Sequence, residues 1–419
     1  MCFNWIGYGN FGSILEATFA AARHELELKM NLISSNEMSG GPTLTALENG
    51  SIAELLSQKA EEVSYPLKRA LRRAARAAFL WQEEAATLLE QGRSITELPS
   101  VGPYLAALIS GWIQKPPALA EPPEIRRGFL TIPRARLLLA RQNRWSSELK
   151  GDLQMHTEWS DGSGSIAQMA QTAEERGYEY IAITDHSKGL KIAGGINEEE
   201  LAEQIDEIDT VNRSLAAGGS RIRVLRSIEL NINPHGEGDM EESALTRLDL
   251  VLGSFHSALR RTDDQTARYL AALGNPIIQI LGHPRGRIYN YRLGLNADWS
   301  RIFATAAELD KAVEIDAYPD RQDLSADLLE LAKKAGCRVS IGTDAHHPWQ
   351  LEFIELGIAA ACLAGIKRER ILNFMTRDEL LMWASQTRSR ANGNGRLKPL
   401  VKRRVRSVKT LHPAVKVRS

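Results

Sequence analysis

Residues that commonly bind metal ions recur at the ends of short apolar runs in the second half of the chain. Residues 151–162, GDLQMHTEWSDG, place Asp152, Gln154, His156 and Asp161 close together. Later runs are followed by further residues of these types: His186, Glu229, His256, His283, Asp344 and His346. A cluster of imidazole and carboxylate groups without cysteine suits manganese, zinc or iron. Such ions can activate water and neutralise phosphate oxygens, so the pattern predicts hydrolysis of a phosphate ester.

Each histidine also has a plainer interpretation. A histidine at the end of one strand is more often a hydrogen-bonded structural residue than a metal ligand, but five of them at five strand ends favour a metal site. We expect Asp185 to orient a liganding histidine rather than bind metal. For Asp152, a similar indirect role and a purely structural one remain equally open.

The elements that must position these residues are parallel strands. Seven short β-rich runs alternate mostly with helical patterns, which predicts a β/α arrangement that closes into a barrel. The runs are residues 151–156, 180–184, 222–230, 248–254, 277–281, 312–315 and 338–342. Residues at the carboxyl ends of barrel strands converge on one rim, so the candidate ligands are expected to meet there.

A helical segment, residues 49–115, precedes the barrel. Within it Lys68, Arg69, Arg72, Arg73 and Arg76 recur at three- and four-residue spacing and share one helix face. This face is either an ordinary solvated surface or a site for nucleic acid, since arginines that neutralise phosphates release counterions.

Residues 94–113, SITELPSVGPYLAALISGWI, begin with a Ser94–Glu97 capping signal and contain a Pro99–Gly102 turn between two apolar segments. This stretch resembles a helix-hairpin-helix motif, in particular the amino-terminal DNA-binding domain of family X DNA polymerases. The resemblance implies DNA contacts by Pro99, Val101 and Gly102 and by Arg69, Arg72, Arg73 and Arg76. Ser100 stands where the motif usually has glycine. A hairpin used only for packing is the alternative.

Residues 150–387 resemble a PHP domain, the polymerase and histidinol phosphatase superfamily, in the version found in bacterial family X DNA polymerases. The matching motifs are GDLQMH (151–156), SDG (160–162), TDHS (184–187), LDLV (248–251), GHP (282–284), VEID (313–316) and TDAH (343–346). The resemblance implies a distorted (β/α)7 barrel, of α/β class, that follows a small all-α domain.

The same resemblance implies up to three divalent ions. Gln154, His156, Glu229 and Asp344 would hold the first ion, Glu229, His256 and His283 the second, and Asp161, His186 and His346 the third. Gln154 replaces a histidine of many relatives and is a weaker ligand. The Asp161 carboxylate favours manganese, with zinc or iron as alternatives. Glu229, Asp344, His256 and Arg285 are the expected catalytic residues, although Arg285 and Arg287 are equally consistent with surface salt bridges.

The remaining segments carry weaker signals. Residues 1–48 receive no function, and residues 116–149 are expected to form a proline-rich linker and a basic helical hairpin. Residues 387–419 contain eleven Lys or Arg and no acidic residue, so we expect residues 388–419 to be a disordered basic tail. Such a tail binds nucleic acid non-specifically or is merely solvated.

Composition sets broad limits. With 52 basic and 52 acidic side chains and 43% hydrophobic residues among 419, the chain has ordinary globular composition. No run resembles a membrane span or signal peptide, so a cytoplasmic protein is expected. The three cysteines are too few for a disulfide framework. About 35 residues separate the hairpin from the barrel, too few for a nucleotidyltransferase palm, so no polymerase activity is expected.

These observations predict a metal-dependent phosphoesterase that acts at DNA 3′ ends in DNA repair, as a 3′-5′ exonuclease or a 3′-phosphatase. One alternative is a histidinol-phosphatase-like enzyme for small phosphomonoesters. A second alternative is a DNA-binding module with an inactive metal site.

Overall fold

The computed structural model describes residues 47–141 and 144–393. The predicted amino-terminal segment 1–48 and basic tail 388–419 therefore lie largely outside the described residues. Where the tail begins, the structure corrects the prediction, because helix α15 continues past residue 387 and spans Arg377–Gly393. Among the described residues no helix is both long enough and apolar enough to cross a membrane.

The barrel is built entirely from parallel strand pairs. A three-stranded sheet has the order β1-β2-β3, and a five-stranded sheet has the order β4-β5-β6-β7-β8. The strands are β1 Gly151–Asp152, β2 Tyr180–Ile183, β3 Arg223–Arg226, β4 Glu229–Asn231, β5 Leu252–Ser254, β6 Ile280–Leu281, β7 Ala312–Asp316 and β8 Arg338–Gly342. Single parallel bridges join the two sheets, Met155 with Ala345 on one side and His186 with Glu229 on the other. The predicted α/β barrel is confirmed, and these isolated bridges account for its distortion.

The third predicted strand is divided into two. Residues 222–230 form β3, which pairs with β2, and β4, which pairs with β5. At the break, the Asp249 carboxylate accepts a hydrogen bond from the Arg226 backbone N–H at 2.8 Å. The division allows Glu229 to begin a new strand at the rim.

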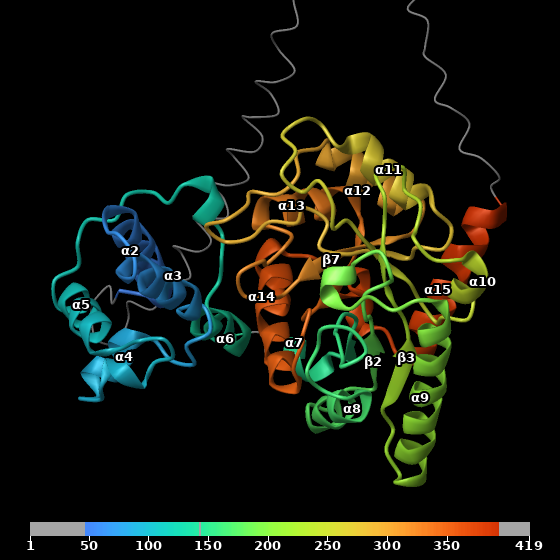
Figure 1. Cartoon of the computed structure of the whole chain (residues 1–419), viewed down its shortest axis with the longest axis horizontal. Coiled ribbons are helices and arrows are strands. Elements are labelled where there is room, and N and C mark those ends of the chain that lie inside the picture. The colour runs from blue at the N-terminus through green and yellow to red at the C-terminus, as the bar shows by residue number, and fades with distance from the viewer. Residues whose placement is uncertain (1–46, 142–143, 394–419) are drawn as a thin grey trace, which may run out of the picture.

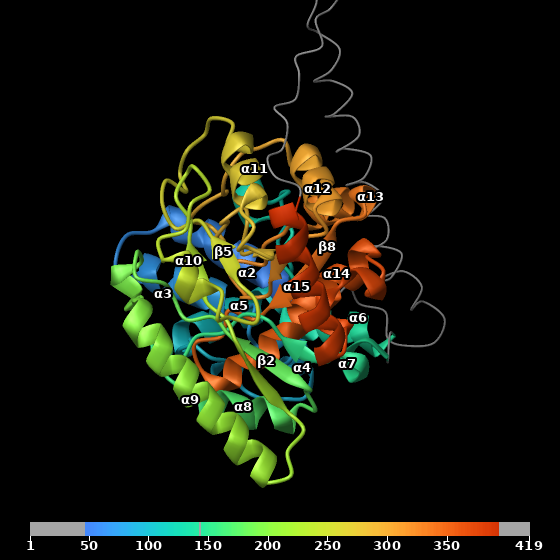
Figure 2. The ribbon, with the colours of Figure 1, turned by 90° about the vertical axis from the view of Figure 1, so that its right-hand side faces the viewer.

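Helices cover the strands on the outside, as Figures 1 and 2 show. The barrel helices are α8 Ile166–Glu175, α9 Glu198–Ala217, α10 Glu242–Leu245, α11 Thr266–Gly274, α12 Trp299–Glu308, α13 Ala326–Ala335, α14 Ile354–Ala364 and α15. Short 3-10 turns lie at η3 Lys191–Ala193, η4 Pro348–Phe353, η5 Arg368–Arg370 and η6 Leu372–Phe374. Buried Val, Ile and Leu fill both faces of the strands, as parallel sheets require. At Gly151 an added Cβ would lie 2.2 Å from the Tyr180 carbonyl oxygen, so β1 and β2 pack too closely for a side chain.

A helical unit packs beside the barrel and has its own hydrophobic core. It contains α2 Asn49–Glu62, α3 Leu67–Ala77, α4 Ala85–Glu90, η1 Ile95–Glu97 and α5 Pro103–Gln114. The predicted capping box of Ser94 and Glu97 is present at the start of η1. Ser100 has a φ of +65°, which explains why glycine would suit this turn.

The segment between the two units joins them firmly. It contains η2 Glu124–Arg126, α6 Ile132–Ala140 and α7 Arg144–Glu148. The ring of Tyr289, from a barrel loop, packs against both Phe79 and Phe129, with centroid distances of 4.8 and 5.2 Å, and its hydroxyl lies 3.0 Å from Ser57 Oγ. Arg126 forms a buried ion pair with Glu54 at 2.9 Å.

Candidate metal centre

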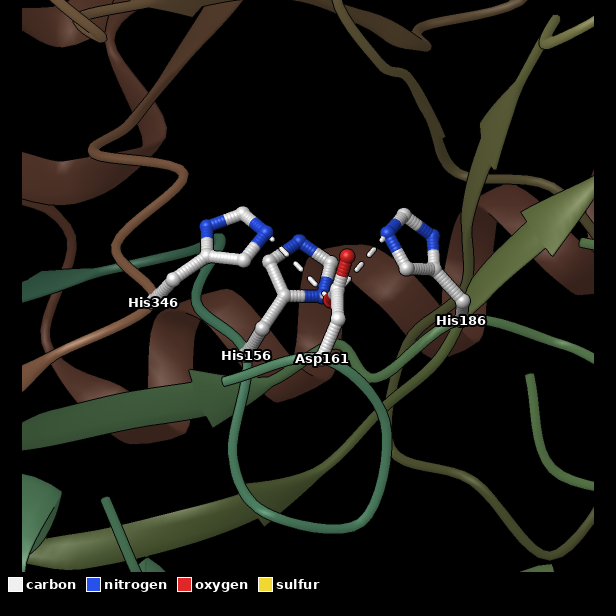
Figure 3. Close-up of side chains that lie close together, drawn as sticks. All are labelled: His156, Asp161, His186 and His346. Carbon is white, nitrogen blue, oxygen red and sulfur yellow. Dashed lines mark ion pairs between the residues drawn. The ribbon is translucent and has the colours of Figure 1, made fainter. Parts of the chain in front are cut away.

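Five histidines and three carboxylates from the ends of the barrel strands meet at one rim. Three sets of ligand atoms each lie within 4.8 Å of one another: His156, Asp161, His186 and His346; His186, Glu229 and His256; and His156, Glu229 and Asp344. Figure 3 shows the first set, in which His346 and His186 flank His156 and Asp161. The His156 ring stacks at 4.4 Å on each of the other two rings. The tertiary structure thus brings together all of these residues, which the sequence analysis selected from six separate segments.

Glu229 lies at the centre of the cluster and is fully buried. Its Oε1 is 2.6 Å from His283 Nε2 and 3.1 Å from His256 Nε2. Its Oε2 is 3.0 Å from His186 Nδ1 and 3.4 Å from His156 Nε2. Burial raises the pKa of Glu229, but the positive charge of the surrounding histidines outweighs burial and holds that pKa well below its usual range.

The other two carboxylates contact histidines as well. Asp344 Oδ1 lies 2.9 Å from His156 Nε2, and Asp161 Oδ1 lies 3.3 Å from His346 Nε2. Burial lowers the pKa of His346, but the hydrogen bond to Asp161 and the negative charges of Asp344 and Asp161 together outweigh burial and raise that pKa to about 9. Asp344 has a φ of +52°, a backbone conformation that costs energy for a residue with a side chain and that is concentrated at functional sites.

The donor set fits divalent cations. Three buried atoms of the ligand type, His156 Nδ1, His186 Nδ1 and Glu229 Oε2, make no hydrogen bond of acceptable geometry among the described residues, although the last two lie 3.0 Å apart. Buried polar atoms are normally paired, and unpaired ones at a functional site point to a missing water or ion. Imidazole and carboxylate donors are those that manganese, zinc and iron accept.

Asp185 does not orient a histidine, in contrast to our expectation. Its carboxylate accepts hydrogen bonds from Thr157 N at 2.7 Å, Thr157 Oγ1 at 2.6 Å, Ser160 Oγ at 2.6 Å and Gln204 Nε2 at 2.7 Å. These donors lie on α9 and on the loop that leads to Asp161. The acceptor positions of the Asp185 carboxylate are occupied by donors of this loop and by Gln204. Asp185 therefore holds in place the loop that carries Asp161.

Asp152 has a structural role at the junction of β1 and β8. It accepts hydrogen bonds from Thr343 N at 3.1 Å and Thr343 Oγ1 at 2.6 Å. Burial raises the pKa of Asp152 to about 6. These bonds hold the backbone that leads to Asp344.

Gln154 pairs with the buried carboxylate of Glu314. In the amide orientation that satisfies both groups, the Gln154 nitrogen donates to the two Glu314 oxygens at 2.6 and 2.9 Å. Gly342 leaves room for both side chains, since an added Cβ would lie 2.3 Å from Glu314 Oε1 and 2.5 Å from Gln154 Cβ. The sequence analysis did not anticipate this pairing, because it depends on three different strands.

Arg321, which was not among the residues selected from the sequence, contacts the cluster. It follows β7, and its guanidinium donates a hydrogen bond to Asp344 Oδ2 and lies 3.6 Å from Asp316 Oδ2. Arg285, chosen instead, pairs with Glu124 of the connecting segment at 3.0 Å. Arg287 is buried and donates to the backbone oxygens of Arg321 and Gln322. Neither Arg285 nor Arg287 has an ion pair with the cluster among the described residues.

The predicted DNA-contacting residues lie in two places. Arg69, Arg72, Arg73 and Arg76 are exposed on α3. In the hairpin, Pro99 and Gly102 are exposed, but Val101 is buried in the helical core and its N–H donates to the Leu98 carbonyl oxygen. Val101 therefore supports the turn from inside and is not available to DNA.

The comparisons with known proteins agree with this geometry. A family model described as "PHP domain" matches residues 152–345. The chain is 36% identical over 227 residues to "DNA polymerase/3'-5' exonuclease PolX" of Bacillus subtilis (strain 168), a match that covers 54% of this chain but only 39% of that protein. It is 30% identical over 191 residues to a "Probable phosphatase" of Caldicellulosiruptor saccharolyticus, covering 43% of this chain and 73% of the relative.

A solved structure is also similar. It is histidinol phosphate phosphatase from Lactococcus lactis subsp. lactis, complexed with zinc, L-histidinol and phosphate. The match has 18% identity and a TM-score of 0.37 and covers 52% of this chain and 94% of that chain, which is too weak a likeness to carry a functional argument. From the family match, the phosphatase relatives and the strand-end ligand cluster, the chain belongs to the PHP domain family.

Proposed function

We propose that this metal-dependent phosphoesterase hydrolyses phosphodiesters or phosphomonoesters at DNA 3′ ends. The observation that carries the proposal is the strand-end cluster around Glu229, whose three ligand groups share residues. The relative from Bacillus subtilis is named as a 3′-5′ exonuclease, which supports DNA as the substrate. Its small coverage leaves the substrate of this chain to experiment.

The basic face of α3 supports the same substrate. Arg69, Arg72 and Arg73 have no carboxylate within 4.0 Å among the described residues, so their charges are free to neutralise phosphates. Arg76 approaches Asp320 at 3.9 Å, and Asp320 directly precedes Arg321 at the cluster. The basic face therefore ends next to the barrel rim, where a strand bound along α3 would reach the cluster.

In the proposed mechanism, His156, Glu229 and Asp344 would hold one ion, Glu229, His256 and His283 would hold a second, and Asp161, His186 and His346 would hold a third. We propose manganese, which the carboxylates favour over softer metals. Such ions supply activation of water and neutralisation of phosphate charge. Arg321 orients Asp344 and adds positive charge next to the substrate phosphate. Asp185 keeps Asp161 in place through the loop from Thr157 to Ser160.

The test is manganese-dependent release of product from a 3′-labelled DNA duplex and from histidinol phosphate, measured in parallel on one preparation. His346→Ala and His256→Ala are expected to abolish DNA end processing, while His235→Ala, a change to an exposed loop residue, keeps it. Rapid hydrolysis of histidinol phosphate with no DNA processing would overturn the DNA proposal. That result would favour a small-molecule phosphatase, the activity that the name of the Caldicellulosiruptor relative suggests.

A further inference from the structure

An aromatic strip made of Tyr318, Phe353 and Trp349 lies beside the metal centre. The Tyr318 ring packs edge-on to His346, with a centroid distance of 6.4 Å. Phe353 joins the other two rings, because its centroid lies 5.4 Å from Tyr318 and 5.3 Å from Trp349. The strip thus runs outward from a candidate metal ligand.

Core packing does not account for the outer end of this strip. Phe353 is buried, but Trp349 is 49% exposed although it is one of the largest apolar side chains. Among the described residues the indole Nε1 of Trp349 and the hydroxyl of Tyr318 form no hydrogen bond with the protein. The outer end of the strip therefore presents aromatic surface to solvent.

Hydrogen bonds fix the backbone at both ends of the strip. Trp349 N donates to His347 Nδ1 at 3.3 Å at the start of η4, and Tyr318 N donates to Asp316 Oδ1 at 2.7 Å. Phe353, at the end of η4, is buried between them. Tyrosine and tryptophan have few rotatable side-chain bonds, so a ligand that stacks on them costs little conformational entropy.

Charged groups on the same loop lie next to the strip. The guanidinium carbon of Arg321 lies 5.4 Å from the centre of the Tyr318 ring, and Arg321 also contacts Asp344. Asp320, between them, faces Arg76 of the basic helix α3. A phosphate at the cluster would therefore have positive charge on one side and aromatic surface on the other.

Resting on the proposed function, we propose that this strip binds the base of the terminal nucleotide whose phosphate lies at the metal centre. Stacking on an aromatic surface tolerates every base, because each base has a π-face. The enzyme would then prefer ends that carry a base over base-free phosphate esters, without preferring one sequence. This selectivity is distinct from the phosphate chemistry of the cluster.

The test compares two single-stranded oligonucleotides that differ only at the 3′ residue, which is an ordinary nucleotide or a tetrahydrofuran abasic residue. For Trp349→Ala we expect KM to rise about tenfold on the ordinary end, with little change in kcat and little change on the abasic end. Trp349→Phe is expected to restore most of the affinity. Tyr318→Leu is a second variant with the same expected pattern.

Met382→Ala is the matched control. Met382 is 60% exposed on α15, and the neighbouring Trp383 bonds to the Asp310 carbonyl oxygen just before β7, at the opposite end of the barrel from the cluster. An equal effect of Trp349→Ala on the ordinary and abasic ends, or none on either, overturns the base-binding assignment. If the unaltered protein hydrolyses neither oligonucleotide with manganese, the proposed function itself fails.

Discussion

Nε2 of His283 lies 2.6 Å from Oε1 of Glu229, and this contact links the start of β4 to the segment that follows β6, across the intervening strand β5. Three further histidines surround the same buried carboxylate. Glu229 is therefore the carboxylate that balances the charge of these histidines, and it belongs to two of the three candidate ligand groups.

Replacing Glu229 with Gln is expected to reduce manganese content and to slow DNA end processing by about 100-fold or more, because a charged ligand shared by two groups becomes a neutral one. Metal per chain, measured by mass spectrometry after reconstitution, and release of labelled product check this expectation. His235→Ala serves as the control. A variant that retained full metal content and turnover would remove Glu229 from the centre of the site.

Gln322 is expected to position Arg321 through the connecting segment. Its side chain is buried, accepts a hydrogen bond from Leu130 N at 2.7 Å and donates to Leu130 O at 2.7 Å. Gln322→Leu would leave both Leu130 groups unpaired and lower the free energy of unfolding by about 2–4 kcal/mol. Urea denaturation measures that loss.

The same variant tests the link to catalysis. Because Gln322 adjoins Arg321, we expect kcat on a 3′-labelled oligonucleotide to fall in the folded variant, with manganese content unchanged. Gln171→Leu, at an exposed position of α8, is the control. A folded Gln322→Leu variant with unaltered kcat would show that the connecting segment only supports the fold.

Simultaneous replacement of Arg69, Arg72 and Arg73 with Gln is expected to weaken duplex DNA binding about tenfold or more. The slope of log affinity against log salt concentration should fall by about 2–3, since each lost phosphate contact contributes about 0.9. Fluorescence anisotropy over a salt series measures both quantities. Arg213, Arg221 and Arg247, exposed on the barrel, give a matched triple control. Equal losses in both triples would mean that α3 has no special part in binding.

Lys311 is expected to lower stability in a pH-dependent way. The side chain is 1% exposed, burial lowers the pKa of its amine to about 7, and Nζ donates to the Asn275 carbonyl oxygen. Between about pH 7 and the ordinary lysine pKa, the unfolded chain binds a proton that the folded protein does not. Stability from this site therefore rises with pH across that window.

Lys311→Met should accordingly raise the free energy of unfolding by about 3 kcal/mol at pH 7, after the lost hydrogen bond is subtracted. The gain should shrink as the pH approaches 10. Urea midpoints at pH 7, 8.5 and 10 for both proteins test this expectation. A gain that is constant across the series would contradict a depressed pKa at this position.

The sequence by itself determined the strand ends and their chemistry. Apolar β-rich runs that end in His156, His186, His256 and His283 predict both a parallel barrel and a shared rim, because parallel strands present their carboxyl ends on the same side. This information is local, because the residues of each run indicate that the run is buried and show which residue follows it. The barrel class and the meeting of the ligands could therefore be predicted without coordinates.

Only the tertiary structure decided which polar groups pair with one another. In the folded protein Arg321 contacts Asp344, whereas Arg285 forms an ion pair with Glu124. Gln154 pairs with Glu314, and the Val101 side chain is buried inside the hairpin. The tertiary structure also divided residues 222–230 into two strands. Such pairings depend on loops and on contacts between distant segments. Hydrophobic periodicity does not predict them, because it indicates only which face of a local segment is buried.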